Sequence, residues 1–165
     1  MKITKLTSLI LSVTMLLCIL TSCSNLSVWR YGVTLYDQAG GWIQSNFATE
    51  NYVIMGGTPN KRTFIVDTQE KYNEIFIDGI DELKTDFSNR MLIVHTRTFI
   101  TKRDCWIKNV KVENGNMKIS YVIENKGFPF YNMGDGSSPY QRWMVLILDK
   151  IDIESVEFEE LNEMF

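Results

Sequence analysis

Two stretches of the chain, Met91–Val94 and Trp143–Leu148, consist entirely of apolar residues with no polar alternation. Short continuous apolar runs are typical of strands that are buried on both faces. We therefore expect both stretches to be central strands of a β-sheet, with a helix covering one side of that sheet.

A different pattern surrounds Asn114-Gly115, where apolar and polar positions alternate on both sides of the pair. Asn-Gly is the favoured type I′ turn, because both of its positions need a positive φ. The pattern predicts a hairpin between residues 106–113 and 116–124, with the polar face solvated. Its register places three apolar pairs on one face: Val112 with Met117, Val110 with Ile119, and Trp106 with Ile123.

One helix is predicted after Asp67, which stands as N-cap with Glu70 three residues on, the spacing of a capping box. Gly79 supplies the expected end of this helix. A helix this short needs packing against a sheet to be stable. Residues at i, i+3 and i+4 form its apolar stripe: Tyr72, Ile75 and Phe76.

Further strands are predicted at 28–36, 52–55 and 63–66, where β-branched and aromatic residues dominate. In the C-terminal stretch, the apolar alternation changes phase near Glu154-Ser155, which predicts a bulge. That stretch is acidic and has no Lys or Arg. We interpret it as a solvated edge strand, with an acidic partner-binding tail as the alternative.

These elements predict an α+β fold, a mostly antiparallel β-sheet with one main helix packed on it. The chain has 165 residues, of which 45% are hydrophobic and 22% are charged. This composition suits a globular protein and excludes a disordered chain, a collagen or a coiled coil. We expect a single β-rich domain over residues 28–165.

The N-terminus is typical of a signal peptide. Lys2 and Lys5 form a basic start, and the mostly apolar segment 6–20 that follows is shorter than the span of about 20 residues that crosses a bilayer. A signal of this kind would direct the chain out of the cytoplasm.

The end of this signal, Leu20-Thr21-Ser22-Cys23, is similar to the bacterial lipobox, in which diacylglycerol is attached to the cysteine and the signal is cut just before it. We predict a lipoprotein signal peptide over 1–22, lipidation of Cys23 and a tether over 23–27. The protein would then be anchored to a membrane on the extracytoplasmic side of the bacterial cell envelope. A plain secretory signal with a chance cysteine is the alternative.

Removal of residues 1–22 changes both the charge and the cysteine content. It lowers the number of basic residues from 17 to 15 against 20 acidic residues, a net charge of −5. Nucleic acid is therefore not an expected partner, because it favours basic surfaces. Cys105 remains as the one free cysteine, so it is a reactive thiol, a contact to another chain or a small buried hydrophobe. Its apolar neighbours favour the last interpretation.

His95, the single histidine, is the main candidate for catalytic chemistry. A triad would need a nucleophile and an orienting carboxylate, and the chain has no nucleophile elbow. We interpret His95 as a strand-end histidine bonded to a neighbour. One histidine and one free cysteine do not make a zinc site, and Gly134-Asp135-Gly136 lacks the lysine and helix of a phosphate loop. We expect no enzyme activity, no cofactor and no metal.

The segment from Asn125 to Gln141 is rich in glycine, proline and aromatic residues. A loop this long in a compact domain is usually functional or disordered, and its aromatic side chains could anchor a partner or stack on sugar rings. The alternative is that Phe128 and Phe130 plug one end of the core. The candidate binding residues are Phe128, Phe130, Tyr131 and Tyr140.

From Thr63 onward, the order of features is similar to that of a known family. The order is a strand, the segment 68–76, Asp86-Phe87-Ser88 before Met91–Val94, the hairpin, Ser138-Pro139-Tyr140 before Trp143–Leu148, and Val156-Glu157-Phe158. Over residues 63–160 this resembles the C-terminal domain of PrcB-type protease-complex subunits, which are themselves bacterial lipoproteins. The chain departs from the family at 103–106, where family members carry Gly-Gly-Tyr. The resemblance implies a non-catalytic subunit that binds and stabilises another envelope protein.

The sequence thus favours a non-enzymatic, lipid-anchored envelope protein that binds a protein or peptide partner, such as an accessory subunit of a protease complex. A carbohydrate- or peptidoglycan-binding module that uses the 125–141 loop is the second interpretation. A hydrolase with carboxylate chemistry is the third, because 20 acidic residues offer many pairs.

Overall fold

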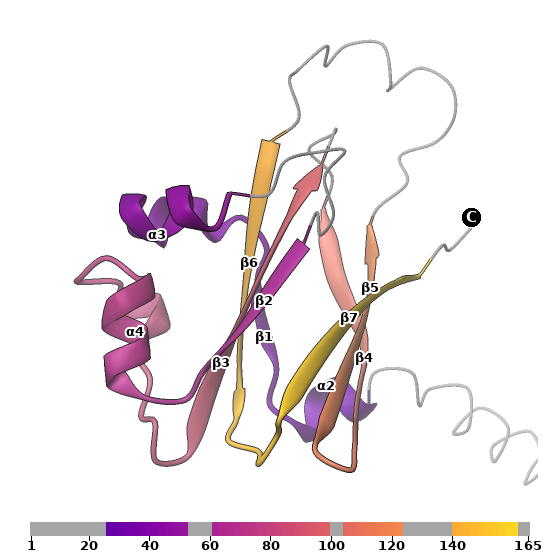
Figure 1. Cartoon of the computed structure of the whole chain (residues 1–165). Helices are drawn as coiled ribbons and strands as arrows, with labels where there is room; N and C mark the ends of the chain where they lie inside the picture. The colour runs from indigo at the N-terminus through magenta and orange to yellow at the C-terminus, as the bar shows by residue number, and fades with distance from the viewer. Residues whose placement is uncertain (1–25, 53–60, 100–103, 124–139, 162–165) are drawn as a thin grey trace, which may run out of the picture.

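The computed structural model describes residues 26–52, 61–99, 104–123 and 140–161. These residues form two β-sheets that pack face to face, and two helices cover the outer side of the larger sheet (Figure 1). The fold is α+β and mostly sheet, as the sequence predicts.

The larger sheet has four antiparallel strands in the order β1-β6-β3-β2. They are β1 (Thr34–Tyr36), β2 (Lys61–Val66), β3 (Arg90–Phe99) and β6 (Tyr140–Asp149). The two predicted central strands, β3 and β6, occupy the middle of this sheet. The strand predicted at 63–66 is confirmed as the main part of β2.

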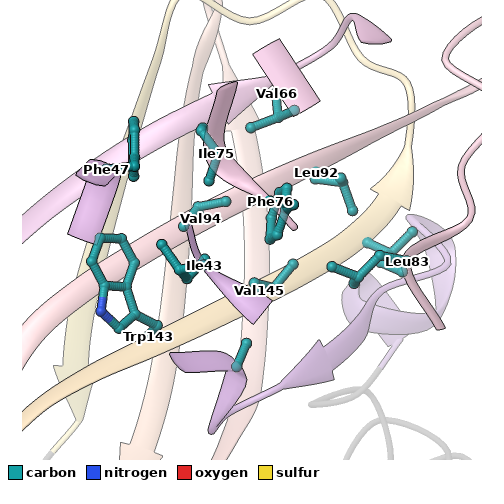
Figure 2. Packing of buried hydrophobic residues seen from close by; sticks show 12 residues of the cluster. Ile43, Phe47, Val66, Ile75, Phe76, Leu83, Leu92, Val94, Trp143 and Val145 are labelled. Atoms are coloured by element: carbon teal, nitrogen blue, oxygen red, sulfur yellow. The ribbon is translucent and has the colours of Figure 1, made fainter. Parts of the chain in front are cut away.

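Both faces of the two central strands are buried. On one face, Leu92, Val94 and Val145 pack against residues of the covering layer such as Ile75 of α4 (Gln69–Ile75) (Figure 2). The opposite face, which includes Met91, packs against the smaller sheet. The larger sheet is therefore the middle layer of three, which explains the continuous apolar runs.

The smaller sheet contains β4 (Cys105–Glu113), β5 (Asn116–Ile123) and β7 (Ser155–Leu161) in the order β4-β5-β7. The predicted hairpin between β4 and β5 is confirmed at its turn, where Asn114 has φ 52° and Gly115 has φ 76°. Next to the turn the register is also as predicted: Val112 faces Met117 and Val110 faces Ile119.

Farther from the turn, the expected pairing of Trp106 with Ile123 is wrong. The register shifts between Ile107 and Asn109, and Cys105 lies opposite Ile123. The extra residue of the bulge changes the alternation of the strand. Cys105 is therefore buried between the sheets, whereas Trp106 is only half-buried.

The C-terminal strand β7 is confirmed as an edge strand, and it pairs with β5 in parallel. Its ladder has no shift, so the bulge predicted near Glu154-Ser155 is wrong. The strand begins at Ser155, and Ile151 and Ile153 pack on the core from the connection that precedes it. The change of phase therefore marks the start of the strand.

The helices are short, and α4 is the longest of those described. The predicted stripe of α4 is confirmed, since Ile75 and Phe76 are buried and Tyr72 is half-buried. The segments are α2 (Leu26–Arg30), η2 (Ala39–Trp42), α3 (Ser45–Glu50), α4 (Gln69–Ile75) and η3 (Asp81–Leu83).

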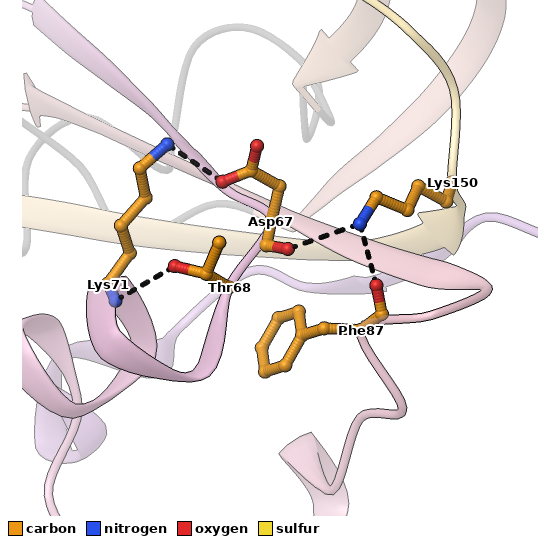
Figure 3. A network of polar contacts seen from close by, with 5 residues as sticks. All are labelled: Asp67, Thr68, Lys71, Phe87 and Lys150. Carbon is orange, nitrogen blue, oxygen red and sulfur yellow. Dashed lines mark hydrogen bonds and ion pairs between the residues drawn. The ribbon is translucent and has the colours of Figure 1, made fainter.

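The predicted ends of α4 are both displaced. The N-cap is Thr68, whose hydroxyl accepts from the Lys71 N–H at 3.3 Å, while the Asp67 carboxylate pairs with Lys71 Nζ at 2.7 Å (Figure 3). This bond holds the pKa of Asp67 below its usual value. The helix ends before Gly79 because Phe76 is extended and forms a β-bridge with Ile43.

The strand predicted at 28–36 is only partly correct. Residues 28–30 of this stretch are the end of α2, and only residues 34–36 form the strand β1. Gly32, at φ +57°, turns the chain between them, and the Asp149 N–H donates to the Tyr31 carbonyl. Of the strand predicted at 52–55, Tyr52 lies outside any strand, and 53–55 lies outside the described residues.

Candidate functional site

The predicted binding loop leaves β5 after Ile123 and enters β6 at Tyr140. Phe128, Phe130 and Tyr131 lie outside the described residues, and Tyr140 is the first residue of β6. We call this end of the two sheets the loop end. The opposite end, where α2 lies beside the last residue of β6, is the α2 end (Figure 1).

Near the loop end, a charged cluster lies between the sheets. We define it by five residues, Asp37, Arg97, Tyr121, Arg142 and Glu160. Arg97 of β3 and Arg142 of β6 are directly opposite each other. Two like charges in this position repel, so a stable sheet needs carboxylates beside them.

Arg142 is the more deeply buried of the two arginines, with a side chain only 1% exposed. Its Nε donates to the Asp37 carbonyl at 2.7 Å, and its Nη2 pairs with Asp37 Oδ2 at 2.5 Å. The Cys105 N–H also donates to Asp37 Oδ2, at 3.2 Å. Asp37 therefore joins the end of β1 to both sheets.

Arg97 connects the two sheets through their side chains. Its Nη1 pairs with Glu160 of β7 at 2.5 Å and donates to the Tyr121 hydroxyl of β5. Burial raises the pKa of Tyr121 to about 12, so its hydroxyl stays protonated at neutral pH. Each arginine thus faces its own carboxylate, and the cluster holds the sheets together.

Cys105 lies against this cluster and has the properties of a buried apolar side chain. Its Sγ is 3.6 Å from Met144 Sδ, and the residue belongs to the core between the sheets. Burial raises the pKa of its thiol to about 12. The thiolate, which is the nucleophile, is therefore almost absent at neutral pH, and the interpretation as a buried hydrophobe is confirmed.

His95 lies in the middle of β3, not at a strand end. Its Nδ1 is 2.8 Å from the Thr63 hydroxyl, as expected for a histidine bonded to a neighbour, and its ring stacks on Phe158 at 4.0 Å. Burial, with the charges of Arg97 and Lys61, lowers its pKa to about 3. The imidazole is neutral at pH 7 and too weak a base to activate the threonine.

The described surface also has a hollow. It is shallow, with a volume of about 300 Å³, and lies beside α4 and η3, lined by residues that include Tyr72, Asp78 and Lys84. Within the described ranges, no three His, Cys, Asp or Glu side chains are grouped as metal ligands would be.

Sequence reasoning missed the charged cluster because its members are far apart in the chain. Asp37 and Arg142 are separated by 105 positions, and Arg97 and Glu160 by 63. One local signal was present. Arg142 directly precedes the apolar run of β6, where a charged residue needs a buried partner.

No protein-family model, curated protein or solved structure matches this chain. The resemblance to PrcB-type subunits therefore stays a prediction. In the part of the chain that the structure describes, no helix combines the length and the apolar character that a membrane span needs.

Proposed function

We propose that the chain is a lipid-anchored protein of the bacterial cell envelope, acylated at Cys23, that binds a protein or peptide partner and is not itself an enzyme. The observation that carries the proposal is the position of the first described helix relative to this cysteine. Helix α2 starts at Leu26, three positions after the lipobox-like Cys23. A lipid on Cys23 would hold the folded domain close to the membrane.

The two ends of the domain support a division of roles. An anchor at Cys23 would bring the α2 end to the membrane, while β5 ends and β6 begins at the other end (Figure 1). In this orientation the loop end faces away from the lipid, where an envelope protein could reach it.

The chemistry near the loop end favours binding over catalysis. Arg97 and Arg142 face carboxylates, and the thiol of Cys105 and the ring of His95 are both uncharged at neutral pH. Such groups stabilise the protein but supply neither a nucleophile nor a base. The resemblance to accessory subunits of protease complexes points in the same direction.

The anchor is tested by changing the acylated residue. Cys23→Ser removes the thiol that accepts the lipid, and two acyl chains are what stable anchoring needs. We expect this variant to leave the membrane fraction after a salt wash, whereas the matched variant Cys18→Ser stays. Membrane retention of Cys23→Ser would contradict the lipoprotein assignment.

The partner is tested through the loop. Tyr131→Ala is expected to weaken capture of an envelope protein by about 30-fold, which corresponds to about 2 kcal/mol, the scale of a binding hot spot. Tyr52→Ala is the control, because Tyr52 is an exposed tyrosine outside the loop. Equal capture by both variants would contradict the site, and binding to isolated peptidoglycan would favour the carbohydrate-binding alternative.

A further inference from the structure

The most exposed of the large apolar side chains described is Trp29, which is 85% exposed. A single exposed apolar residue is common on protein surfaces and needs no explanation by itself. The position of Trp29 is what distinguishes it, because it belongs to α2, the first helix after Cys23.

The chain between the anchor and Trp29 is short. Ser24 and Asn25 are the only residues between Cys23 and the start of α2 at Leu26. Three extended steps and three helical steps reach at most about 15 Å from Cys23 to Trp29. The polar layer on each side of a bilayer is about 5–8 Å thick, so an anchored Cys23 keeps Trp29 at or near that layer.

Contacts with the rest of the domain determine which way α2 faces. The Ser27 hydroxyl donates to Asn109 Oδ1 at 2.5 Å and accepts from the Val110 N–H at 3.2 Å, and Val28 packs on the core between the sheets. The next two residues, Trp29 and Arg30, are both exposed. The exposed indole of Trp29 is therefore carried by a helix that is fixed to the domain, and the exposed guanidinium of Arg30 lies beside it, 5.7 Å from the centroid of the Tyr31 ring.

We propose that Trp29 and Arg30 contact the lipid headgroup layer and orient the domain, with the α2 end on the membrane and the loop end away from it. This inference rests on the proposed lipid anchor. Tryptophan favours the membrane–water interface because its ring is apolar and its N–H is polar. Arg30 is attracted to lipid phosphates, whereas the processed chain as a whole has a net charge of −5 and is repelled by anionic lipid.

The experiment uses the full lipidated protein, reconstituted into vesicles of phosphatidylethanolamine and phosphatidylglycerol whose acyl chains carry bromine. Bromine quenches tryptophan fluorescence at short range. We expect quenching in the wild type and in Trp106→Phe, and its loss in Trp29→Phe. Both variants keep an aromatic ring. Trp106 is the control because it is a half-buried tryptophan of β4 and is not part of α2.

A second variant tests the charge. With Arg30→Glu, we expect the quenching of Trp29 to fall in vesicles that contain phosphatidylglycerol and to change less in vesicles of phosphatidylcholine alone. Equal quenching of wild type and variant in both kinds of vesicle would contradict the role of Arg30.

Flotation of the vesicles separates the two proposals. One outcome is that the protein floats with the vesicles while Trp29→Phe is quenched as strongly as the wild type. In that case the proposed contact between Trp29 and lipid is wrong. If the wild type does not float, the lipid anchor is wrong, and the orientation that depends on it fails as well.

Discussion

Asp37→Ala is expected to destabilise the protein by about 3–5 kcal/mol, the range measured when one member of a buried ion pair is removed. The change leaves the guanidinium of Arg142, whose side chain is 1% exposed, without the carboxylate that faces it. Urea unfolding of the variant and the wild type measures the difference.

Glu160→Ala is the matched control for this prediction. It removes the carboxylate that faces Arg97, but the Arg97 and Glu160 side chains are 24% and 35% exposed. Water can replace part of the lost interaction, so the expected loss of stability is smaller. Equal losses of stability in the two variants would contradict the prediction that the more buried ion pair contributes more to stability.

A double variant distinguishes the cost of an uncompensated charge from a loss of packing. Asp37→Leu with Arg142→Met replaces the buried pair by apolar side chains, which is often neutral or stabilising. We expect this double variant to be more stable than Asp37→Ala. If it is equally unstable, the contribution of the Asp37 carboxylate lies in its other contact, the bond that it accepts from the Cys105 N–H.

The second large effect is a pH dependence caused by His95. Its pKa is about 3 in the folded protein and near 6.5 in the unfolded chain. Above pH 6.5 the ring is neutral in both states, and its contribution to stability is complete. Below pH 6.5 the unfolded chain binds a proton that the folded protein excludes, so stability falls by up to about 1.4 kcal/mol per pH unit.

Unfolding free energies measured between pH 7 and pH 5 test this expectation. His95 is the only histidine of the chain, and most carboxylates remain ionised in this range. His95→Phe keeps an aromatic ring to stack on Phe158 and removes the titrating group. We expect its stability to change less with pH, and parallel curves for the two proteins would contradict the assignment.

Local patterns predicted the elements whose conformation depends on neighbouring residues. Asn114-Gly115 adopts the positive φ angles of the expected turn, and the turn determines the nearby pairing of Val110 with Ile119. The apolar stripe of α4 was also predictable, because Tyr72 and Ile75 lie three positions apart on the helix and both contact the same core cluster.

The failures arise where distant contacts override local preference. Val28 and Trp29 have strand-forming side chains but belong to α2, whose Ser27 bonds to Asn109 of β4. The bulge in β4 likewise buries Cys105 and moves Trp106 off the core face. Both results involve contacts with residues that lie far away in the chain or on the neighbouring strand.

The same distinction applies to function. The lipobox-like segment that ends at Cys23 and the aromatic residues of the loop are sequence predictions, because each is a short local pattern. The charged cluster needs β3 and β6 side by side, so that Arg97 lies opposite Arg142, and it needs β7 to bring Glu160 to Arg97.

The signal at the N-terminus stays a sequence prediction. By itself, the sequence determined the turn, the helix stripe and the two buried strands. The turn and the helix stripe depend on interactions within a few residues. The buried strands are recognised from the apolar composition of a single segment. Only the tertiary structure decided that β7 runs parallel to β5, that Asp37 faces Arg142 and that Trp29 faces away from the domain. Those arrangements depend on contacts between residues far apart in the chain, and local preferences do not specify them.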